Sequence, residues 1–350
     1  MKYLFAIRLI SGILGIIFAF WSFLQFRRRF IKRHEFLFLA ILGIGLFIVA
    51  VYPDSINIVA GMMALDNRQY GRLIALLILS NMLLWVLAIG QRSKDAVKSI
   101  QFDFLVRRLA MEKFSEKDVL KSIKEITVII PALNEAENLD YILPKMPKSI
   151  MGHPLGVLVV DDGSVDNTVD VVAKHGYSVV PNPINRGGGA ALRLGYDIAV
   201  ASGAKIIVTM DADGQHLPEE VERLVAPILN DALDIVIGSR VLGQHEKDSI
   251  FRWVGIHVFN FVINLLAGTR ITDCSNGFRA FRMDSLKKVL LVQDQFHTAE
   301  LIIDAARKGM RIGEVPVTVL RRFSGESKKG KNLSYGFNFS KTILKAWFRK

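Results

Sequence analysis

The chain has 350 residues, of which 51% are hydrophobic, and it carries 45 Lys and Arg against 33 Asp and Glu, a formal net charge of +12. The single cysteine, Cys274, excludes an intrachain disulfide and a zinc site built on cysteines. The positive charge suits nucleic acid or an anionic membrane surface. The apolar segments at the start of the chain favour the membrane surface, so we expect a lipid bilayer as partner and no nucleic acid.

Three apolar stretches lie near the N-terminus, at about 3–26, 36–52 and 73–89. A helix that crosses a bilayer needs about 20 apolar residues, with a range of about 17–25. We therefore predict an α-helical transmembrane domain over residues 1–93, with a buried core helix as the alternative for the shorter stretches. A cleaved signal peptide is excluded because the first stretch is too long and three arginines follow it.

Basic residues set the predicted orientation of this domain. The segment 27–34 holds Arg27, Arg28, Arg29, Lys32 and Arg33, whereas the segment 53–72 balances two Arg with two Asp. Because Lys and Arg accumulate on the cytosolic side, we expect a multi-pass protein of a prokaryotic plasma membrane, with its N-terminus outside and the domain that follows residue 93 in the cytosol. Residues 94–125 are charged with helical periodicity, which predicts a helical linker.

From residue 126 onward, short β-branched runs alternate with helical segments. The runs 126–130, 157–160, 206–210 and 235–237 are continuously apolar, as buried parallel strands require. Alternating strands and helices predict an α/β fold with a doubly wound, mostly parallel sheet. Ligands of such sheets bind at the carboxyl ends of the strands, so the functional residues should follow these runs.

Acidic residues do follow them. Asp161 and Asp162 come after the second run, and Asp211 and Asp213 come after the third. Residues i and i+2 of an extended segment point the same way, so the last two carboxylates should project together. Such a pair with water and substrate phosphates suits Mg²⁺ or Mn²⁺.

Six motifs carry a resemblance to a known family. VIIPALNEAENL, VVDDGSVDNT, INRGGGAALRLG and VTMDADGQH resemble family 2 glycosyltransferases of the GT-A fold, which is Rossmann-like. TDCSNGFRAF and EVPVTVLRRFSGESKK resemble the dolichyl-phosphate mannose synthase branch and its polyprenyl-phosphate relatives. The resemblance covers residues 126–330 and implies a nucleotide-sugar donor and a polyisoprenyl phosphate acceptor. The N-terminal part resembles a small hydrophobic domain fused to some of these enzymes.

The resemblance also implies roles for individual residues. The nucleotide-sugar would contact Pro131, Leu133, Glu135, Asp161, Asp162, Asp211, Ala212 and Asp213. The metal would be held by Asp211, Asp213 and Gln215. The lipid phosphate needs cations, and arginine suits phosphate because its guanidinium forms two parallel hydrogen bonds. The candidates for it are Arg240, Arg252, Ser275, Arg279 and Lys328, with Asp213 and Arg240 as the catalytic residues.

Three further segments allow predictions. The glycine-rich turn at 185–189 could present N–H groups to a phosphate, and close helix packing explains it equally well. The apolar segment 250–268 contains Asn260 and Asn264, which are costly in lipid, so we predict an amphipathic helix lying in the membrane interface. The basic tail 331–350 predicts a second such helix, with a buried core helix as the alternative.

The expected reaction transfers one sugar from a UDP- or GDP-linked donor to dolichyl or undecaprenyl phosphate, with inversion at the anomeric carbon. One alternative is an enzyme that extends a polysaccharide or oligosaccharide, but the acceptor-clamping Gln/Arg-x-x-Arg-Trp type of motif is not found after the last strand. A second is a non-catalytic membrane scaffold, which the intact Asp211 and Asp213 pair argues against. The sugar, the nucleotide and the oligomeric state stay open.

Overall fold

The chain forms two compact units, Met1–Val97 and Lys98–Lys350. The computed structural model describes residues 2–27, 33–55, 98–112, 122–182, 184–245, 250–289 and 297–325, with the short pieces 57–58, 61, 77, 80–81, 84, 87, 91, 291 and 342–343. Most of the predicted helix 73–89, the tail 331–350 and the whole of Lys328 lie outside the described residues.

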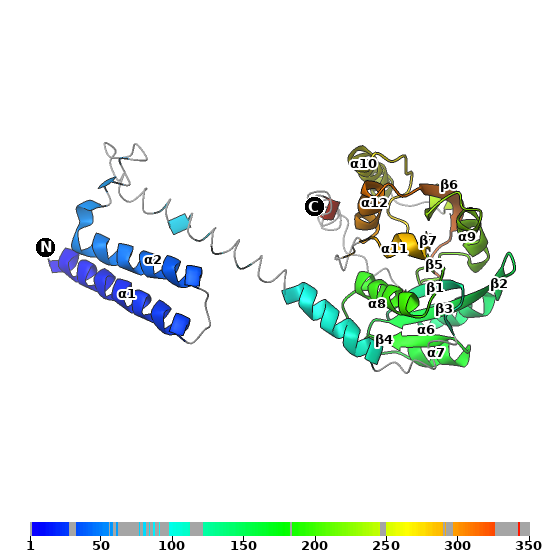
Figure 1. The fold of residues 1–350 in the computed structure, drawn as a ribbon, viewed down its shortest axis with the longest axis horizontal. Coiled ribbons are helices and arrows are strands. Elements are labelled where there is room, and N and C mark those ends of the chain that lie inside the picture. Colours follow the sequence, from blue (N-terminus) through cyan, green and yellow to red (C-terminus); the bar gives the residue numbers. More distant parts are fainter. Residues whose placement is uncertain are drawn as a thin grey trace. The chain divides into compact units, whose positions relative to one another are not determined.

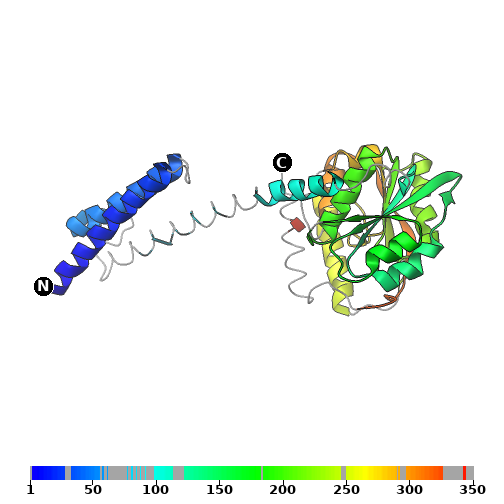
Figure 2. The ribbon, with the colours of Figure 1, turned by 90° about the horizontal axis from the view of Figure 1, so that it is seen from below.

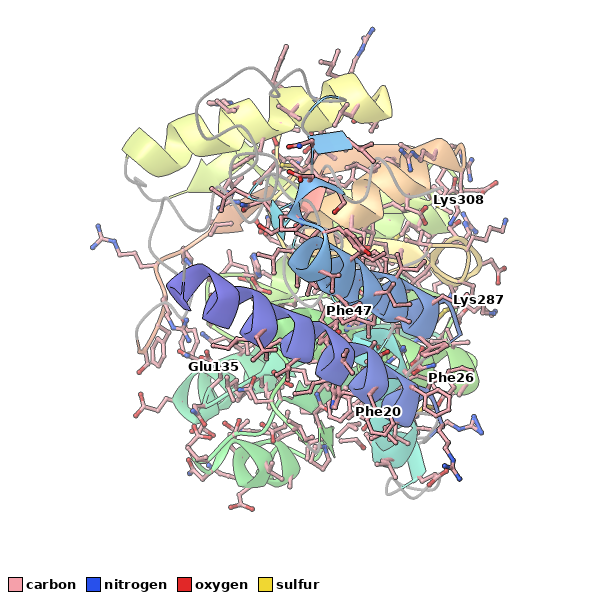
Figure 3. All side chains as sticks on the ribbon, turned by 90° about the vertical axis from the view of Figure 1, so that its left-hand side faces the viewer. Phe20, Phe26, Phe47, Glu135, Lys287 and Lys308 are labelled. Atoms are coloured by element: carbon pink, nitrogen blue, oxygen red, sulfur yellow. The ribbon has the colours of Figure 1, made fainter. Side chains whose placement is uncertain are left out.

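The first unit is built on a pair of helices, α1 (Lys2–Arg27) and α2 (Arg33–Val51), followed by the 3₁₀ turn η1 (Pro53–Ser55). The two helices lie side by side (Figures 1 and 2). Glycines allow the close approach, because a Cβ at Gly15 would lie 2.8 Å from the carbonyl oxygen of Gly43. Phe20 on α1 and Phe47 on α2, both labelled in Figure 3, are among many large apolar side chains that stay exposed.

The predicted membrane topology needs correction. Along the described stretches of the chain, no helix combines enough length and apolarity to cross a bilayer. α1 has charged residues at both ends, Lys2 and Arg27, and Arg8 within it, and α2 opens with polar residues, so that its apolar run begins only at Phe36. The predicted multi-pass localisation is therefore wrong, and the predicted orientation, which depended on the spans, falls with it.

The second unit contains an eight-stranded sheet with the order β2-β3-β1-β5-β7-β6-β8, in which β4 also pairs with β3. Its strands are β1 (Ile126–Ala132), β2 (Ser149–Ile150), β3 (His153–Asp161), β4 (Ser178–Pro181), β5 (Ile206–Thr209), β6 (Ile235–His245), β7 (Arg279–Arg282) and β8 (Ile312–Val319). β4, β3, β1 and β5 run parallel, and β7 runs antiparallel to both of its neighbours, β5 and β6. The four predicted apolar runs fall in β1, β3, β5 and β6, with Met210 one residue beyond the end of β5. The antiparallel β7 was not predicted.

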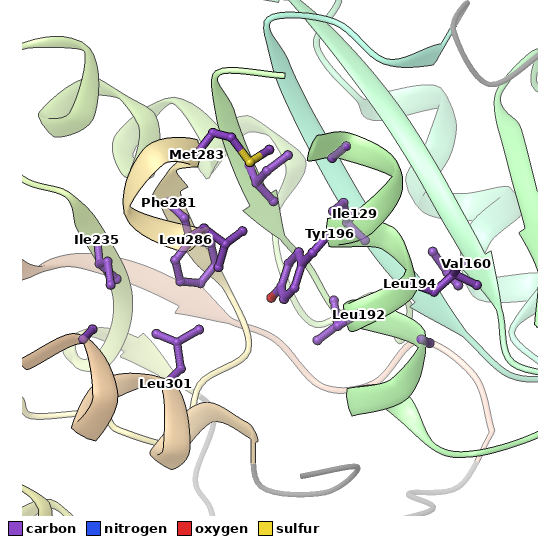
Figure 4. Close-up of a cluster of buried hydrophobic side chains, with 14 of the residues drawn as sticks. Ile129, Val160, Leu192, Leu194, Tyr196, Ile235, Phe281, Met283, Leu286 and Leu301 are labelled. Atoms are coloured by element: carbon purple, nitrogen blue, oxygen red, sulfur yellow. The ribbon is translucent and has the colours of Figure 1, made fainter. Parts of the chain in front are cut away.

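Helices cover both faces of this sheet (Figure 2). Residues 98–112 form a helix that precedes the first strand of the sheet. The other helical elements are α6 (Ala136–Ile142), η2 (Leu143–Lys145), α7 (Thr168–Lys174), α8 (Gly188–Ala201), η3 (Pro218–Glu220), α9 (Val221–Leu229), α10 (Ile250–Ala267), α11 (Met283–Leu286) and α12 (His297–Arg307). Side chains of α8, α10 and α12 share one apolar cluster, part of which Figure 4 shows, and those of α6, α7 and α9 share another.

The alternation of side chains along each strand explains why these strands are apolar throughout. Ile129 of β1 belongs to the α8 cluster, whereas its neighbours Val128 and Ile130 belong to the α9 cluster. Because successive strand residues point to opposite faces, a sheet covered on both sides needs apolar residues at every position. This arrangement confirms the predicted α/β fold with a mostly parallel sheet covered on both faces.

Candidate active site

The strand register brings the motif residues to one edge of the sheet. Ala132 at the end of β1 pairs with Asp161 at the end of β3. On the other side, Thr209 near the end of β5 pairs with Arg279 at the start of β7, and Arg279 also pairs with Ile237 of β6. The loops after β1, β3 and β5 and the loop before β7 therefore meet at the carboxyl edge, where ligands of such sheets bind.

Asp161 and Asp162 are both buried at this edge. The Asp161 carboxylate accepts a hydrogen bond from the backbone N–H of Ser164 at 3.1 Å, which closes the turn after β3. Asp162 donates its own backbone N–H to the carbonyl of Ala132. The ends of β1 and β3 are thereby joined, with half-buried Pro131 and Leu133 on the neighbouring strand and loop.

The glycine-rich turn at 185–189 donates backbone hydrogen bonds to a carboxylate of the same chain. The Asp162 carboxylate accepts hydrogen bonds from the backbone N–H groups of Arg186 at 3.1 Å and Gly187 at 2.6 Å, and from Asn182 Nδ2 at 2.8 Å. Burial raises the pKa of Asp162 above its usual value, although these hydrogen bonds counteract the rise. Close packing is seen outside the turn, at Gly195 of α8, where a Cβ would lie 2.5 Å from Ile129 Cγ2, whereas a Cβ at Gly188 in the turn would meet nothing within 4 Å.

Asp211 and Asp213 follow β5, half-buried on either side of the buried Ala212. Gly277 lies directly against the first of them, because a Cβ there would come within 2.8 Å of Asp211 Oδ1. Asp213 Oδ1 accepts the backbone N–H of Gln215 at 3.2 Å. The Gln215 side chain donates its Nε2 to the carbonyl of Leu320 at 2.8 Å.

The oxygen atoms of these side chains suit a divalent cation as ligands. Within the described part of the chain, no three His, Cys, Asp or Glu side chains gather as a ready-made metal site. The chain offers Asp211 and Asp213 as carboxylate ligands and keeps the Cβ-free Gly277 beside the first. Mg²⁺ and Mn²⁺ sites in phosphate-transfer enzymes have this form, with one or two carboxylates and the remaining ligands from substrate phosphates and water.

Glu135, labelled in Figure 3, is buried at the start of α6. Its carboxylate accepts hydrogen bonds from Arg322 Nη2 and from Asn138 Nδ2. Arg322 belongs to the segment Leu320–Gly325 that follows β8, called the strap segment below. The backbone N–H of Phe323 donates to the carbonyl of Asp213 at 3.3 Å, and the Phe323 ring stacks on Tyr141 at 4.2 Å. The strap segment thus connects the acidic loop after β5 to α6.

Arg240, in β6, is held by a buried partner. Its Nε lies 2.6 Å from Asp273 Oδ2 and its Nη2 lies 3.0 Å from Asp273 Oδ1, and Nη2 also donates to Ser275 Oγ at 2.6 Å. Burial by itself would raise the pKa of Asp273, but the hydrogen bonds and charge of Arg240 outweigh it, and the pKa lies below its usual value. The predicted residues Arg240 and Ser275 are therefore in direct contact.

The loop that carries Asp273 is fixed from two sides. Glu314 of β8 accepts the backbone N–H groups of Thr272 at 2.8 Å and Asp273 at 2.9 Å. Asn260 of α10 donates to the Thr272 carbonyl and accepts the N–H of Cys274 at 2.9 Å. Asn260, which would be costly in a helix embedded in lipid, therefore binds the loop that carries Asp273.

Arg279 lies beneath this surface rather than on it. Its guanidinium donates to the carbonyls of Asn276, Thr298 and Cys274 at 2.7 to 3.0 Å, and the residue is 2% exposed. Arg279 therefore shapes the loop from behind. Arg252 falls within α10, and its side chain, like the whole of Lys328, lies outside the described part of the structure.

Comparison with known proteins agrees with this geometry. Residues 127–290 match the family described as glycosyl transferase family 2. An uncharacterised protein of Methanocaldococcus jannaschii is 36% identical over 219 residues, covering 61% of this chain and 88% of that protein.

The chain belongs to glycosyl transferase family 2. Two named relatives of this glycosyltransferase act on polyprenyl lipids. The UDP-N-acetylglucosamine–dolichyl-phosphate N-acetylglucosaminyltransferase of Methanococcus voltae is 31% identical, covering 63% of this chain and 95% of that protein. The polyprenol monophosphomannose synthase of Mycolicibacterium smegmatis is 33% identical, covering 59% of this chain and 82% of that protein.

Solved structures show the same fold at lower identity. Glucosyl-3-phosphoglycerate synthase from Mycobacterium tuberculosis, crystallised with Mg²⁺ and UDP, superposes with a TM-score of 0.52 at 19% identity. The match covers 67% of this glycosyltransferase and 83% of that chain. It supports the GT-A fold.

Sequence reasoning missed three residues that hold the site together, namely Asp273, Glu314 and Arg322. All three lie inside motifs that were recognised, Asp273 two residues before Ser275, and Glu314 and Arg322 within EVPVTVLRRFSGESKK. For Asp273 the available signal was an acid that lies in the sequence between the two candidate arginines Arg240 and Arg279. Nothing in the sequence indicated that Glu314, 41 positions further along, would accept its N–H group.

Proposed function

We propose that this glycosyltransferase moves a single sugar from a UDP- or GDP-linked donor to a polyisoprenyl phosphate, with inversion. One observation carries the proposal: the loop Ser275–Gly277 contacts Arg240 at one end and Asp211 at the other. Two residues span at most about 7 Å of chain, so a cation suited to an acceptor phosphate lies close to the acids suited to a donor's metal.

On the donor side, Asp211 and Asp213 would hold Mg²⁺ or Mn²⁺, which offsets the charge developing on the departing nucleoside diphosphate. Gln215 would complete this part of the site. Asp161 and Asp162, with Pro131, Leu133 and Glu135, surround the place where the nucleoside would bind. The strap segment closes this side through the contact between Arg322 and Glu135.

On the acceptor side, Arg240 supplies a planar guanidinium whose orientation is set by Asp273 and Ser275. Arginine in a fixed orientation recognises a phosphate through parallel hydrogen bonds. A phosphate monoester has a second pKa of about 6 and is an anion at neutral pH. The acceptor oxygen therefore needs no protein base, and its direct attack on the anomeric carbon inverts the configuration.

The named relatives support the acceptor class and leave the sugar open. One uses a UDP-linked N-acetylglucosamine with dolichyl phosphate, and another makes a polyprenol monophosphomannose. We propose the shared feature, a polyisoprenyl phosphate, as the acceptor of this chain.

We infer from the exposed side chains of α10 that the reaction takes place at a lipid surface. Val258, Phe261 and Leu265 are 52%, 68% and 71% exposed and share one face by their spacing of three and four residues. The opposite face carries the buried Asn260 and Ile263, and Asn260 binds the loop of Asp273. An exposed apolar stripe on a helix attached to the phosphate-binding loop suits an acceptor whose isoprenoid chain lies in a bilayer surface.

The proposal is tested by incubating the purified protein with Mg²⁺ or Mn²⁺, a panel of nucleotide-sugars and a short-chain polyprenyl phosphate. Mass spectrometry of the lipid product should show a gain of one sugar with one donor of the panel. Replacing the acceptor by the corresponding polyprenol, which lacks the phosphate, should abolish the product.

A further inference from the structure

A cluster of charged side chains joins the helix at 98–112 to α8 and to the turn before it. Asp103 Oδ1 accepts a hydrogen bond from Arg193 Nη2 at 2.9 Å and lies 3.1 Å from Arg186 Nη1. Asp103 Oδ2 lies 3.0 Å from Arg107 Nε. This helix precedes the residues 127–290 that match the glycosyltransferase family, so the family resemblance does not account for it.

The charges of this cluster are largely shielded from water. The side chains of Asp103, Arg186 and Arg193 are only 11%, 10% and 5% exposed. Arg107 also pairs with Asp197 of α8, and the guanidinium of Arg186 lies 5.4 Å from the centre of the Phe102 ring. Buried charges are costly unless they are paired, so the cluster fixes how this helix docks.

Burial by itself would raise the pKa of Asp103. The hydrogen bond from Arg193 and the charges of Arg193, Arg107 and Arg186 outweigh that effect, and the pKa of Asp103 lies below its usual value. The carboxylate is therefore ionised at neutral pH.

Arg186 connects the cluster to the donor side of the active site. Its side chain pairs with Asp103, while its backbone N–H, with that of Gly187, donates to the carboxylate of Asp162. Gly187 has a φ of 91°, a left-handed conformation that is accessible mainly to glycine. The turn that holds Asp162 is therefore anchored at Arg186 from outside the family domain.

We propose that Asp103 is a positioning residue for nucleotide binding, acting through Arg186 on the turn that orients Asp162. The inference rests on the proposed function insofar as Asp162 lies in the donor pocket. Without the Asp103 carboxylate, the Arg186 side chain loses its anchor, and part of the donor's binding free energy goes into ordering the turn. Because a helix outside the matched region supplies the anchor, donor affinity depends on how residues 98–112 are docked.

Two variants of the full-length protein test this role, with Arg108→Ala as matched control, since Arg108 is exposed on the same helix. Asp103→Asn removes the central charge. Arg186→Gln leaves the contacts of Asp103 with Arg193 and Arg107 in place and removes the ion pair between Asp103 and Arg186 together with the contact of the guanidinium with Phe102. The readouts are calorimetric affinity for UDP and GDP with Mn²⁺, the KM values of both substrates, kcat and the melting temperature.

We expect both variants to weaken nucleotide binding and raise the donor KM about tenfold, a loss of about 1.4 kcal/mol. The acceptor KM should not change, kcat should stay within about twofold, and Arg186→Gln should melt like the wild type. Wild-type nucleotide affinity in Arg186→Gln would overturn the inference, even if Asp103→Asn fails to fold. Nucleotide binding is measured without acceptor, so absence of sugar transfer in the wild type would count against the proposed function alone.

Discussion

Arg240 and Asp273 form a two-point ion pair, with Nε to Oδ2 at 2.6 Å and Nη2 to Oδ1 at 3.0 Å. The Asp273 side chain is fully buried, and its backbone N–H is held by Glu314. The pair fixes both the position and the plane of the Arg240 guanidinium beside Ser275.

Arg240→Lys keeps the positive charge and loses the planar fork. We expect kcat/KM for the polyprenyl phosphate to fall about 100-fold, because a charge-assisted hydrogen bond is worth about 1.5–3 kcal/mol. The donor KM should change little. Arg282→Lys is the matched control, since Arg282 is also on the β6–β7 side of the sheet but pairs with Asp231 and Asp234 at the opposite edge. Equal losses in the two variants would show that Arg240 has no special role.

Asp273→Asn should destabilise the fold in a pH-dependent way. Removing one partner of a buried ion pair costs about 3 kcal/mol or more. Because the folded-state pKa of Asp273 is lowered, its ionised form stabilises the fold at pH values above about 4, the pKa of an unfolded aspartate. That contribution is lost as the pH falls from about 4 through the folded-state pKa.

The measurement is urea unfolding of wild type and Asp273→Asn at pH 7 and at several values below 4. The difference in unfolding free energy should be largest at pH 7 and should shrink as the pH falls. A difference that stays constant down to pH 2 would mean that the charge of Asp273 does not contribute.

Asp213→Ala should remove most of the activity and leave the fold intact, because metal stabilisation of a leaving group is worth several kcal/mol. We expect at least a ~100-fold lower kcat and the loss of Mn²⁺-dependent UDP binding in calorimetry. EDTA should inactivate the wild type, with recovery after Mg²⁺ or Mn²⁺ is added. Asp284→Ala is the control, since that side chain is 81% exposed on α11. Full activity of Asp213→Ala in EDTA would rule out the metal role.

Much of the fold was predictable because burial on both faces of a sheet imposes apolar residues at every strand position. Ile129 and Ile130 face different helix layers, and each layer requires an apolar residue at the strand position that faces it. The antiparallel β7 was not predictable, since strand direction depends on pairing with distant β5 and β6 rather than on the residues Arg279–Arg282 themselves.

In the candidate site, too, local features were predictable from the sequence and contacts between distant residues were not. The place of Asp211 and Asp213 directly after a buried strand was predictable because the pattern is local, two carboxylates in one short segment that follows an apolar run. Arg279 shows what sequence cannot supply: it shares the charge and the motif of a phosphate ligand, and only the fold places its guanidinium on three backbone carbonyls. The sequence also predicted three membrane spans, whereas no helix in the described part of the chain combines the length and apolarity needed to cross a bilayer.

The pair of Glu135 and Arg322 should be energetically coupled. Both side chains are mostly buried, and they join α6 to the strap segment. Glu135→Gln, Arg322→Gln and the double variant form a cycle in which we expect a coupling energy of about 1–2 kcal/mol, as contacting charged residues show. Unfolding free energies of the four proteins measure it. Additivity within about 0.3 kcal/mol would mean that the contact contributes nothing to stability.

The pH profile of the reaction should follow the acceptor rather than a protein base. We expect kcat/KM for the lipid phosphate to level off above pH 7 and to fall below about pH 6, where the phosphate monoester takes up a proton. An α-linked donor should give a β-linked product by NMR. Retention of configuration would contradict a single displacement.

The most direct test of the central claim is the identity of the acceptor, measured by mass spectrometry of the lipid product from matched polyprenyl phosphate and polyprenol with the same nucleotide-sugar. The account predicts a single sugar on the polyprenyl phosphate, its loss in Asp213→Ala, and no product from polyprenol. Sugar transfer to polyprenol at a comparable rate, or repeated additions to one acceptor, would contradict it.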